Sequence, residues 1–140
     1  MSTEKVIYDA AKDATMQDSY IDADEQRERV LPDGTVLPYR YVHGGFRRNS
    51  IKFIFCFPPK EQYKGRFFQY LSPFPGPDEE LASLDKTGED DKIAFCLTHG
   101  AYYVESNMGS TAAFGDRPDA RMCFKASAAA AEFSRKVAME

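Results

Sequence analysis

The chain has 140 residues and a formal net charge of −4 at pH 7, with 29% charged and 43% hydrophobic residues. This length suits one domain with a single core, and the composition is typical of a globular protein. Acidic residues gather at 9–28 and 78–91, and no block of Lys or Arg is long enough to follow a phosphate backbone. We therefore expect no nucleic-acid partner.

Targeting and redox signals are sparse. Met1 is followed by polar and charged residues, and no stretch approaches the ~20 apolar residues that cross a bilayer. We expect a soluble, cytoplasmic chain with no signal peptide and no membrane partner. Cys56, Cys96 and Cys123 lack the C-x-x-C spacing of a zinc or thioredoxin-like site. Reduced thiols are the simplest interpretation, and one disulfide stays open if the protein is exported.

The first part of the chain divides near residue 30. Residues 1–30 are acidic with scattered apolar positions, which predicts a mobile arm with at most one short helix near 18–29. Turn-forming residues at 32–34 then open a single α/β domain over 31–140. Residues 35–46 are typical of a strand that a glycine pair, Gly44 and Gly45, interrupts.

Two aromatic strands follow. Residues 51–59 are apolar on both pleat faces until a proline pair, which indicates a central strand. Residues 65–73 predict a further strand. The next segment, 74–80, is a loop because prolines flank its glycine.

The C-terminal part alternates helix and strand. Residues 90–100 predict a helix that Asp90 or Asp91 caps, with Gly100 at its C-terminal end. A strand at 101–107 and an alanine-rich helix at 122–139 follow. This order predicts an α/β fold: a mixed sheet with antiparallel first strands turning parallel, and helices packed on it. A crossover helix normally leads to another parallel strand, and none follows here.

Residues 53–73, FIFCFPPKEQYKGRFFQYLSP, resemble the tannase and feruloyl esterase group of α/β-hydrolases. There a strand ends in a Leu-Pro-like pair, a W-x-G-R-F turn follows, and the next strand leads to a glycine-rich oxyanion loop. The stretch that matches here comprises Tyr63, Gly65, Arg66, Phe67, Phe68 and Gln69. The helix, glycine and polar strand tip at 93–110 look similar too, so the resemblance covers about 50–138 and implies an incomplete α/β-hydrolase fold.

The chain departs from that family at two places. The loop after the third strand is proline-rich, and proline lacks the N–H that an oxyanion hole requires. The oxyanion candidates that the resemblance leaves are Ser72, Phe74 and Gly76. The nucleophile elbow G-x-S-x-G does not occur, so we identify no catalytic nucleophile.

Several side chains are candidate site residues. The tip of the strand at 101–107 lies where ligands bind in open α/β sheets, so Glu105, Ser106, Asn107 and Gly109 are candidates for a cleft floor, or equally a surface turn. His99 favours a helix-end role, and no nucleophile can be paired with His43. Cys56 and Cys96 favour the core, Cys123 stays a weak candidate thiol, and Arg66 favours a structural role.

The sequence supports two functions. One is the amino-terminal part of an esterase-type α/β-hydrolase that lacks the nucleophile and is inactive on its own; whether the chain is an enzyme stays open. The other is a non-catalytic binding or oligomerisation module with an aromatic groove. We expect a small-molecule ester or aromatic ligand, a homo-oligomer or a partner chain, no cofactor and no metal, since the acids at 78–80 and 89–91 lack EF-hand order.

Overall fold

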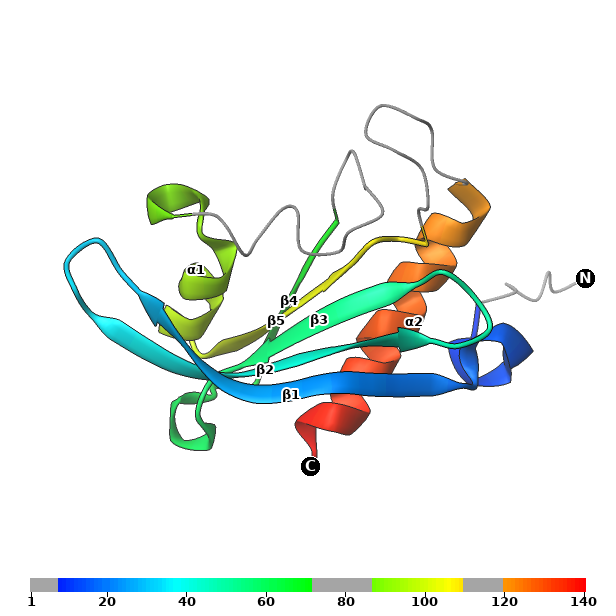
Figure 1. Ribbon diagram of the computed structural model, residues 1–140, viewed down its shortest axis with the longest axis horizontal. Helices are drawn as coiled ribbons and strands as arrows, with labels where there is room; N and C mark the ends of the chain where they lie inside the picture. The colour runs from blue at the N-terminus through cyan, green and yellow to red at the C-terminus, as the bar shows by residue number, and fades with distance from the viewer. Residues whose placement is uncertain (1–7, 72–86, 110–119) are drawn as a thin grey trace, which may run out of the picture.

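A computed structural model describes residues 8–71, 87–109 and 120–140 of the protein. Within these ranges the chain forms one five-stranded mixed sheet and two α-helices (Figure 1). The elements are β1 (Ser19–Val30), β2 (Val36–Phe46), β3 (Lys52–Phe57), β4 (Arg66–Tyr70), α1 (Lys92–Thr98), β5 (Ala101–Ser106) and α2 (Ala120–Ala138). Short 3-10 turns occupy Ala10–Lys12, Ala14–Met16, Lys60–Gln62 and Gly88–Asp90.

The strand order is β1-β2-β3-β5-β4. The pairs β1–β2, β2–β3 and β3–β5 are antiparallel, whereas β4 and β5 are parallel. This confirms the predicted mixed sheet that begins antiparallel and turns parallel. β3 is buried on both faces, as its continuous apolar sequence predicts.

The helix predicted near 18–29 is wrong. These residues form β1, which pairs with β2 from Ser19 opposite Phe46 to Val30 opposite Val36. The ordered core therefore begins before Leu31, where the sequence had placed its start. Most β1 side chains are exposed or half-buried, so the strand is held by its ladder to β2 and shows no apolar alternation in the sequence.

Gly44 and Gly45 do not interrupt β2, which runs on to Phe46. They allow a close approach of neighbouring backbone. A Cβ atom on Gly44 would lie 2.0 Å from the carbonyl oxygen of Tyr20, and one on Gly45 would lie 2.4 Å from that of Ile51. The glycine pair thus lets β1 and the β2–β3 turn pack against this end of β2.

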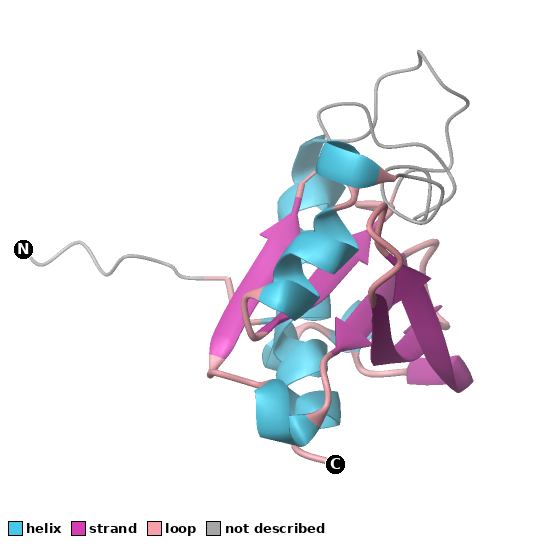
Figure 2. Ribbon diagram, turned by 90° about the vertical axis from the view of Figure 1, so that its left-hand side faces the viewer, coloured by secondary structure: helices cyan, strands magenta, loops and turns pink. Residues whose placement is uncertain are grey.

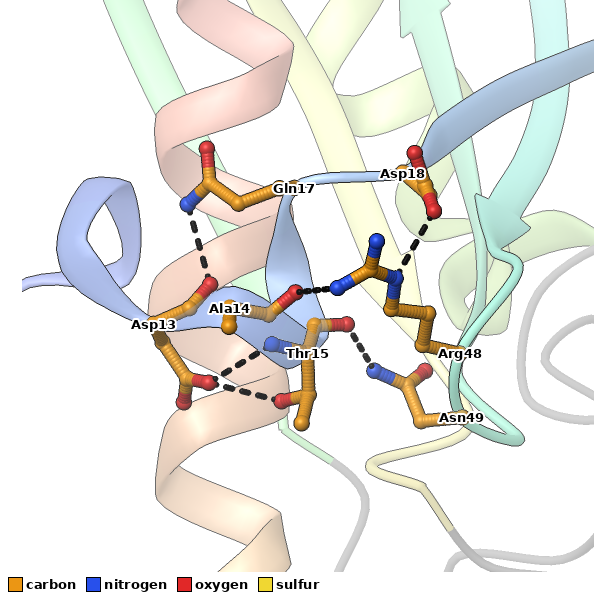
Figure 3. A network of polar contacts seen from close by, with 7 residues as sticks. All are labelled: Asp13, Ala14, Thr15, Gln17, Asp18, Arg48 and Asn49. Atoms are coloured by element: carbon orange, nitrogen blue, oxygen red, sulfur yellow. Dashed lines mark hydrogen bonds and ion pairs between the residues drawn. The ribbon is translucent and has the colours of Figure 1, made fainter.

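The acidic segment before β1 is anchored to the turn between β2 and β3 (Figure 3). Asp13 accepts hydrogen bonds from the backbone N–H and the hydroxyl of Thr15, which fixes a tight turn. Arg48 Nε donates to Asp18 Oδ2 at 2.8 Å, and Asn49 Nδ2 donates to the Thr15 carbonyl oxygen at 2.9 Å. Two separate stretches of chain are therefore joined at this end of the sheet.

The helices pack on opposite faces of the sheet. The buried side chains of α1 share a cluster with Ile54, Cys56 and Tyr103. Those of α2 share another with Phe53, Phe55 and the remaining inward residues of β5, Tyr102 and Val104. Since successive strand residues point to opposite faces, each helix covers one face. Figure 2 shows the helices in cyan beside the twisted magenta strands.

Candidate functional site at the strand tips

The polar tip of β5 is buried. Glu105, Ser106 and Asn107 are each at most 5% exposed, and they lie at the carboxyl end of the strand. β4 runs parallel to β5, so both strands end on this side of the sheet, with Tyr70 opposite Glu105. The loop expected to supply oxyanion donors, with Ser72, Phe74 and Gly76, follows β4 but lies outside the described residues.

Asn107 links the tip of β5 to the start of β3. Its side-chain oxygen accepts from the N–H of Lys52 at 3.1 Å and from that of Gly109 at 2.9 Å. Its amide nitrogen donates to the Ser50 carbonyl oxygen at 2.9 Å. Both functional groups of the side chain are therefore occupied by the backbone, which is the behaviour of a turn-forming residue.

The backbone after Asn107 takes an unusual course. Met108 has φ 54° and Gly109 has φ 74°, so two successive residues lie in the left-handed region. The N–H of Met108 donates to Ser106 Oγ, and Ser50 Oγ donates to the Gly109 carbonyl oxygen. A non-glycine residue in this region costs free energy and persists where surrounding contacts hold it, often next to functional sites.

Glu105 occupies the α1 face of the sheet. The hydroxyl of Tyr103, two residues earlier on the same face, donates to Glu105 Oε2 at 2.9 Å. Both side chains are almost fully buried. A carboxylate buried at a strand end is costly unless it is hydrogen-bonded, so the Tyr103 hydroxyl helps to hold it there.

The structure places His43 in the same cross-strand row as Glu105. His43 is paired with Ile54, and Ile54 with Glu105. Two strand spacings put the backbones of His43 and Glu105 about 10 Å apart on one face. Nδ1 of His43 contacts Asp22 Oδ1 across the β1–β2 pair. This imidazole and carboxylate pair was missed because β1 was not recognised as a strand. Asp22 is also the residue at which the β1–β2 register shifts, so regular hairpin pairing from the turn would have placed it opposite Gly44.

The remaining candidates contact the ends of α1. His99 Nδ1 lies 2.7 Å from the Phe95 carbonyl oxygen at the end of α1, which confirms the helix-end interpretation. Arg66 Nη1 donates to the His99 carbonyl oxygen at 3.2 Å and so ties the start of β4 to that helix end. Asp91 caps α1 through the N–H of Ala94, as predicted.

The cysteines are free thiols. Cys56 and Cys96 are buried, which confirms their core placement, and desolvation raises the pKa of both thiols, that of Cys96 to about 12. A thiol held protonated is a poor nucleophile. Cys123 is half-buried near the start of α2.

A cavity of about 510 Å³ opens at the other end of the sheet. Its walls come from the end of β3, from the turn before β4 and from the C-terminal end of α2. The lining includes Phe57, Pro58, Tyr63 and Tyr102 together with Arg40, Lys60 and Glu140. This site was not predicted as a pocket, since its parts are brought together by strand order.

The described ranges contain neither a metal-binding cluster nor a membrane-spanning helix. No group of three His, Cys, Asp or Glu side chains is arranged there to hold a metal ion. No helix in those ranges is long and apolar enough to span a bilayer.

Comparison with known proteins gives little support for assigning the chain to a family. No protein-family model matches the chain, and no curated protein does. Among solved structures it is similar to tannin acyl hydrolase from Aspergillus niger, with 12% sequence identity and a TM-score of 0.38. The similarity covers 66% of this chain and 18% of that chain, so the chain spans less than a fifth of that structure. A likeness of this strength carries no argument about activity.

Proposed function

We propose that this chain is the front part of an esterase-type α/β-hydrolase domain, and that a further parallel strand completes it along the free edge of β4. The completing strand, from a continuation or a partner chain, would bring the nucleophile. The arrangement of the two helices on opposite faces of the sheet is the observation that carries the proposal.

Crossover handedness supports this position for the strand. The connection from β4 through α1 to β5 moves toward β3, with its helix on one face. α2 follows β5 on the opposite face. Because strand–helix–strand crossovers are right-handed, a helix on the opposite face leads in the opposite direction. The next parallel strand then falls beyond β4.

The side chains of β4 suit an interior strand. Phe68 stacks near Tyr103 on the α1 face, and Phe67 packs edge-on against Tyr102 on the α2 face. The two phenylalanines are 37% and 39% exposed, because no described strand covers their other side. An edge strand that is apolar on both faces is a site for strand addition.

The proposed sheet would place a cleft at the carboxyl ends of β4 and β5. In doubly wound sheets, ligands bind where the order of strands reverses, and here the reversal falls between these two strands. Glu105, Ser106, Asn107 and Gly109 would form its floor, and Ser72, Phe74 and Gly76 would flank it. Ester hydrolysis there needs a nucleophile, a base and N–H donors directed at the oxyanion, and we assign none of the first two to this chain.

The free edge can be tested by light scattering on the 140-residue chain. We expect it to self-associate as its concentration rises, and Phe67→Lys with Phe68→Lys to keep it monomeric, because charges on an edge strand block pairing. Val30→Lys is the matched control, since Val30 is exposed on β1, at the opposite edge of the sheet from β4. A wild-type chain that stays monomeric, or a control that acts like the double variant, would count against the proposal.

Activity gives an independent test. The 140-residue chain should hydrolyse a small phenolic ester no faster than buffer, and a longer chain that supplies the nucleophile of the next strand and its base should hydrolyse it. Turnover by the short chain that survives repurification would overturn the proposal.

A further inference from the structure

The cavity at the far end of the sheet has features of a small-molecule site. Its volume of about 510 Å³ falls within the range of ligand pockets, roughly 300–1,000 Å³. Tyr63 precedes β4 and Tyr102 lies at the start of β5, so the cavity is separated from the strand tips by the length of the sheet. It is therefore distinct from the cleft proposed above.

Aromatic rings that hold one another in place form its wall. The ring centroids of Phe57 and Tyr102 are 5.2 Å apart, and those of Tyr63 and Tyr102 are 6.0 Å apart. The hydroxyl of Tyr102 lies 3.3 Å from Ser134 Oγ on α2, which fixes this ring further. Tyr63 is 43% exposed, so its ring has surface that a ligand can cover. The wall is apolar, and its rings are tilted against one another, by 38° between Phe57 and Tyr102 and by 52° between Tyr63 and Tyr102.

Lys60 supplies a cation beside this wall. The 3-10 turn Lys60–Gln62 is closed by a hydrogen bond from the Tyr63 N–H to the Lys60 carbonyl oxygen. Side chains three residues apart eclipse one another in such a turn, so Lys60 and Tyr63 point the same way, and both line the cavity. Within the described residues Lys60 forms no ion pair, so its ammonium group is available to a ligand.

The other charged groups of the cavity set the orientation of a ligand. Arg40 is held by Asp24 through two hydrogen bonds of 2.8 and 2.7 Å, which neutralises its charge. Glu140 also lines the cavity, where its carboxylate repels anions. A ligand's negative group is therefore favoured at Lys60, with its ring against Tyr63 and Tyr102.

We propose that this cavity binds a small planar aromatic carboxylate, with the ring on the tyrosine wall and the carboxylate on the Lys60 ammonium group. This inference goes beyond the esterase proposal and does not depend on it. It assigns to the chain a ligand that binds without being converted.

The test uses benzoate as the probe, with ligand-observed and protein-observed NMR on the 140-residue chain. For so small a ligand we expect a dissociation constant on the order of millimolar, with shifts in the Phe57 and Tyr102 resonances. Cyclohexanecarboxylate, which has the charge without the flat ring, and benzyl alcohol, which has the ring without the charge, should both bind more weakly.

Variants separate the two contributions. Lys60→Gln should weaken benzoate binding about threefold to fivefold, as expected for one partly exposed charge pair, and leave benzyl alcohol unchanged. Tyr63→Leu should weaken both. Lys52→Gln, at an exposed position at the other end of β3, is the control and should change neither.

The proposal is overturned if benzoate produces no shifts at about 20 mM, a concentration above the expected dissociation constant. It is equally overturned if Lys60→Gln and Tyr63→Leu leave benzoate binding at the wild-type level. Both side chains are exposed, so circular dichroism should show an unchanged fold. These outcomes do not bear on β4, and the two proposals can fail separately.

Discussion

Arg29 and Asp91 form a largely buried ion pair, with 2.8 Å between Arg29 Nη2 and Asp91 Oδ2. It joins the far end of the β1–β2 ribbon to the N-terminus of α1, which lie side by side in Figure 1. Asp91 also accepts from the Ala94 N–H as the cap of α1. The Asp91 carboxylate therefore pairs with Arg29 of β1 and also caps the N-terminus of α1.

This double role of Asp91 predicts graded losses. Asp91→Ala should lower the free energy of unfolding by about 3–5 kcal/mol, because it removes the carboxylate that pairs with a largely buried guanidinium and also removes the cap. Asp91→Ser keeps a capping oxygen and should cost about 1 kcal/mol less. Urea unfolding of both variants measures the difference, and equal losses would show that the cap contributes nothing.

The pair formed by Asp24 and Arg40 predicts a dependence on pH. Hydrogen bonds from Arg40 lower the pKa of the Asp24 carboxyl, so the folded state holds this proton less tightly than the unfolded state does. The stabilisation is present above the unfolded pKa of about 3.9 and is lost as the pH falls through the lower folded pKa.

Unfolding midpoints between pH 7 and pH 3 test this prediction. The wild type should lose more stability on acidification than Asp24→Asn, by up to about 1 kcal/mol because the pair is partly exposed. Glu61→Gln, at an exposed position, is the control, and its loss of stability between pH 7 and pH 3 should match that of the wild type. Identical pH profiles for the wild type and Asp24→Asn would show that this ion pair does not contribute to the pH dependence of stability.

Gly44 and Gly65 should respond differently to alanine. A Cβ at Gly44 would collide with the Tyr20 carbonyl, so Gly44→Ala should cost about 2–4 kcal/mol as β1 is forced away. Gly65 has φ 73° with open space around it, so Gly65→Ala should cost about 1–2 kcal/mol from backbone strain. Thermal or urea unfolding ranks the two, and the reverse order would contradict the steric argument.

The cysteines predict an order of labelling. A thiol reagent at neutral pH should modify Cys123 first, because Cys56 and Cys96 are buried with raised pKa values. Cys56 and Cys96 should react at the rate of unfolding, which mass spectrometry of the labelled chain in increasing urea can follow. Rapid modification of Cys56 without denaturant would contradict its buried position.

Strong local signals made most of the fold predictable. The continuous apolar run of β3 and the capping pattern of α1 gave correct elements, since each signal lies within a few residues. β1 was missed because pairing with β2, rather than its own composition, holds it as a strand. The cross-strand row that holds His43 and Glu105 depends on the registers of β2 with β3 and of β3 with β5, which no local sequence signal gives.

The candidate site was predictable to a similar degree. The polar tip of β5 was predicted from its residue types, but the sequence did not distinguish a cleft floor from a surface turn. The contacts of Asn107 with Ser50 and Lys52 join residues more than fifty positions apart, and no short motif predicts them. The aromatic cavity likewise depends on the order β3-β5-β4 and on the end of α2.

Asn107 provides the last prediction, because it distinguishes a turn from a working cleft floor. Asn107→Ala removes both acceptor contacts and the donor contact to Ser50, and should cost about 2–3 kcal/mol of stability. Asn107→Asp keeps the acceptor but loses the donor, and should cost about half as much. Chemical denaturation measures both, and hydrogen exchange at the Lys52 and Gly109 amides reports whether the turn has opened. If Asn107→Ala leaves stability and exchange unchanged, the turn does not depend on this side chain, and a role in the proposed cleft becomes the better explanation of its burial.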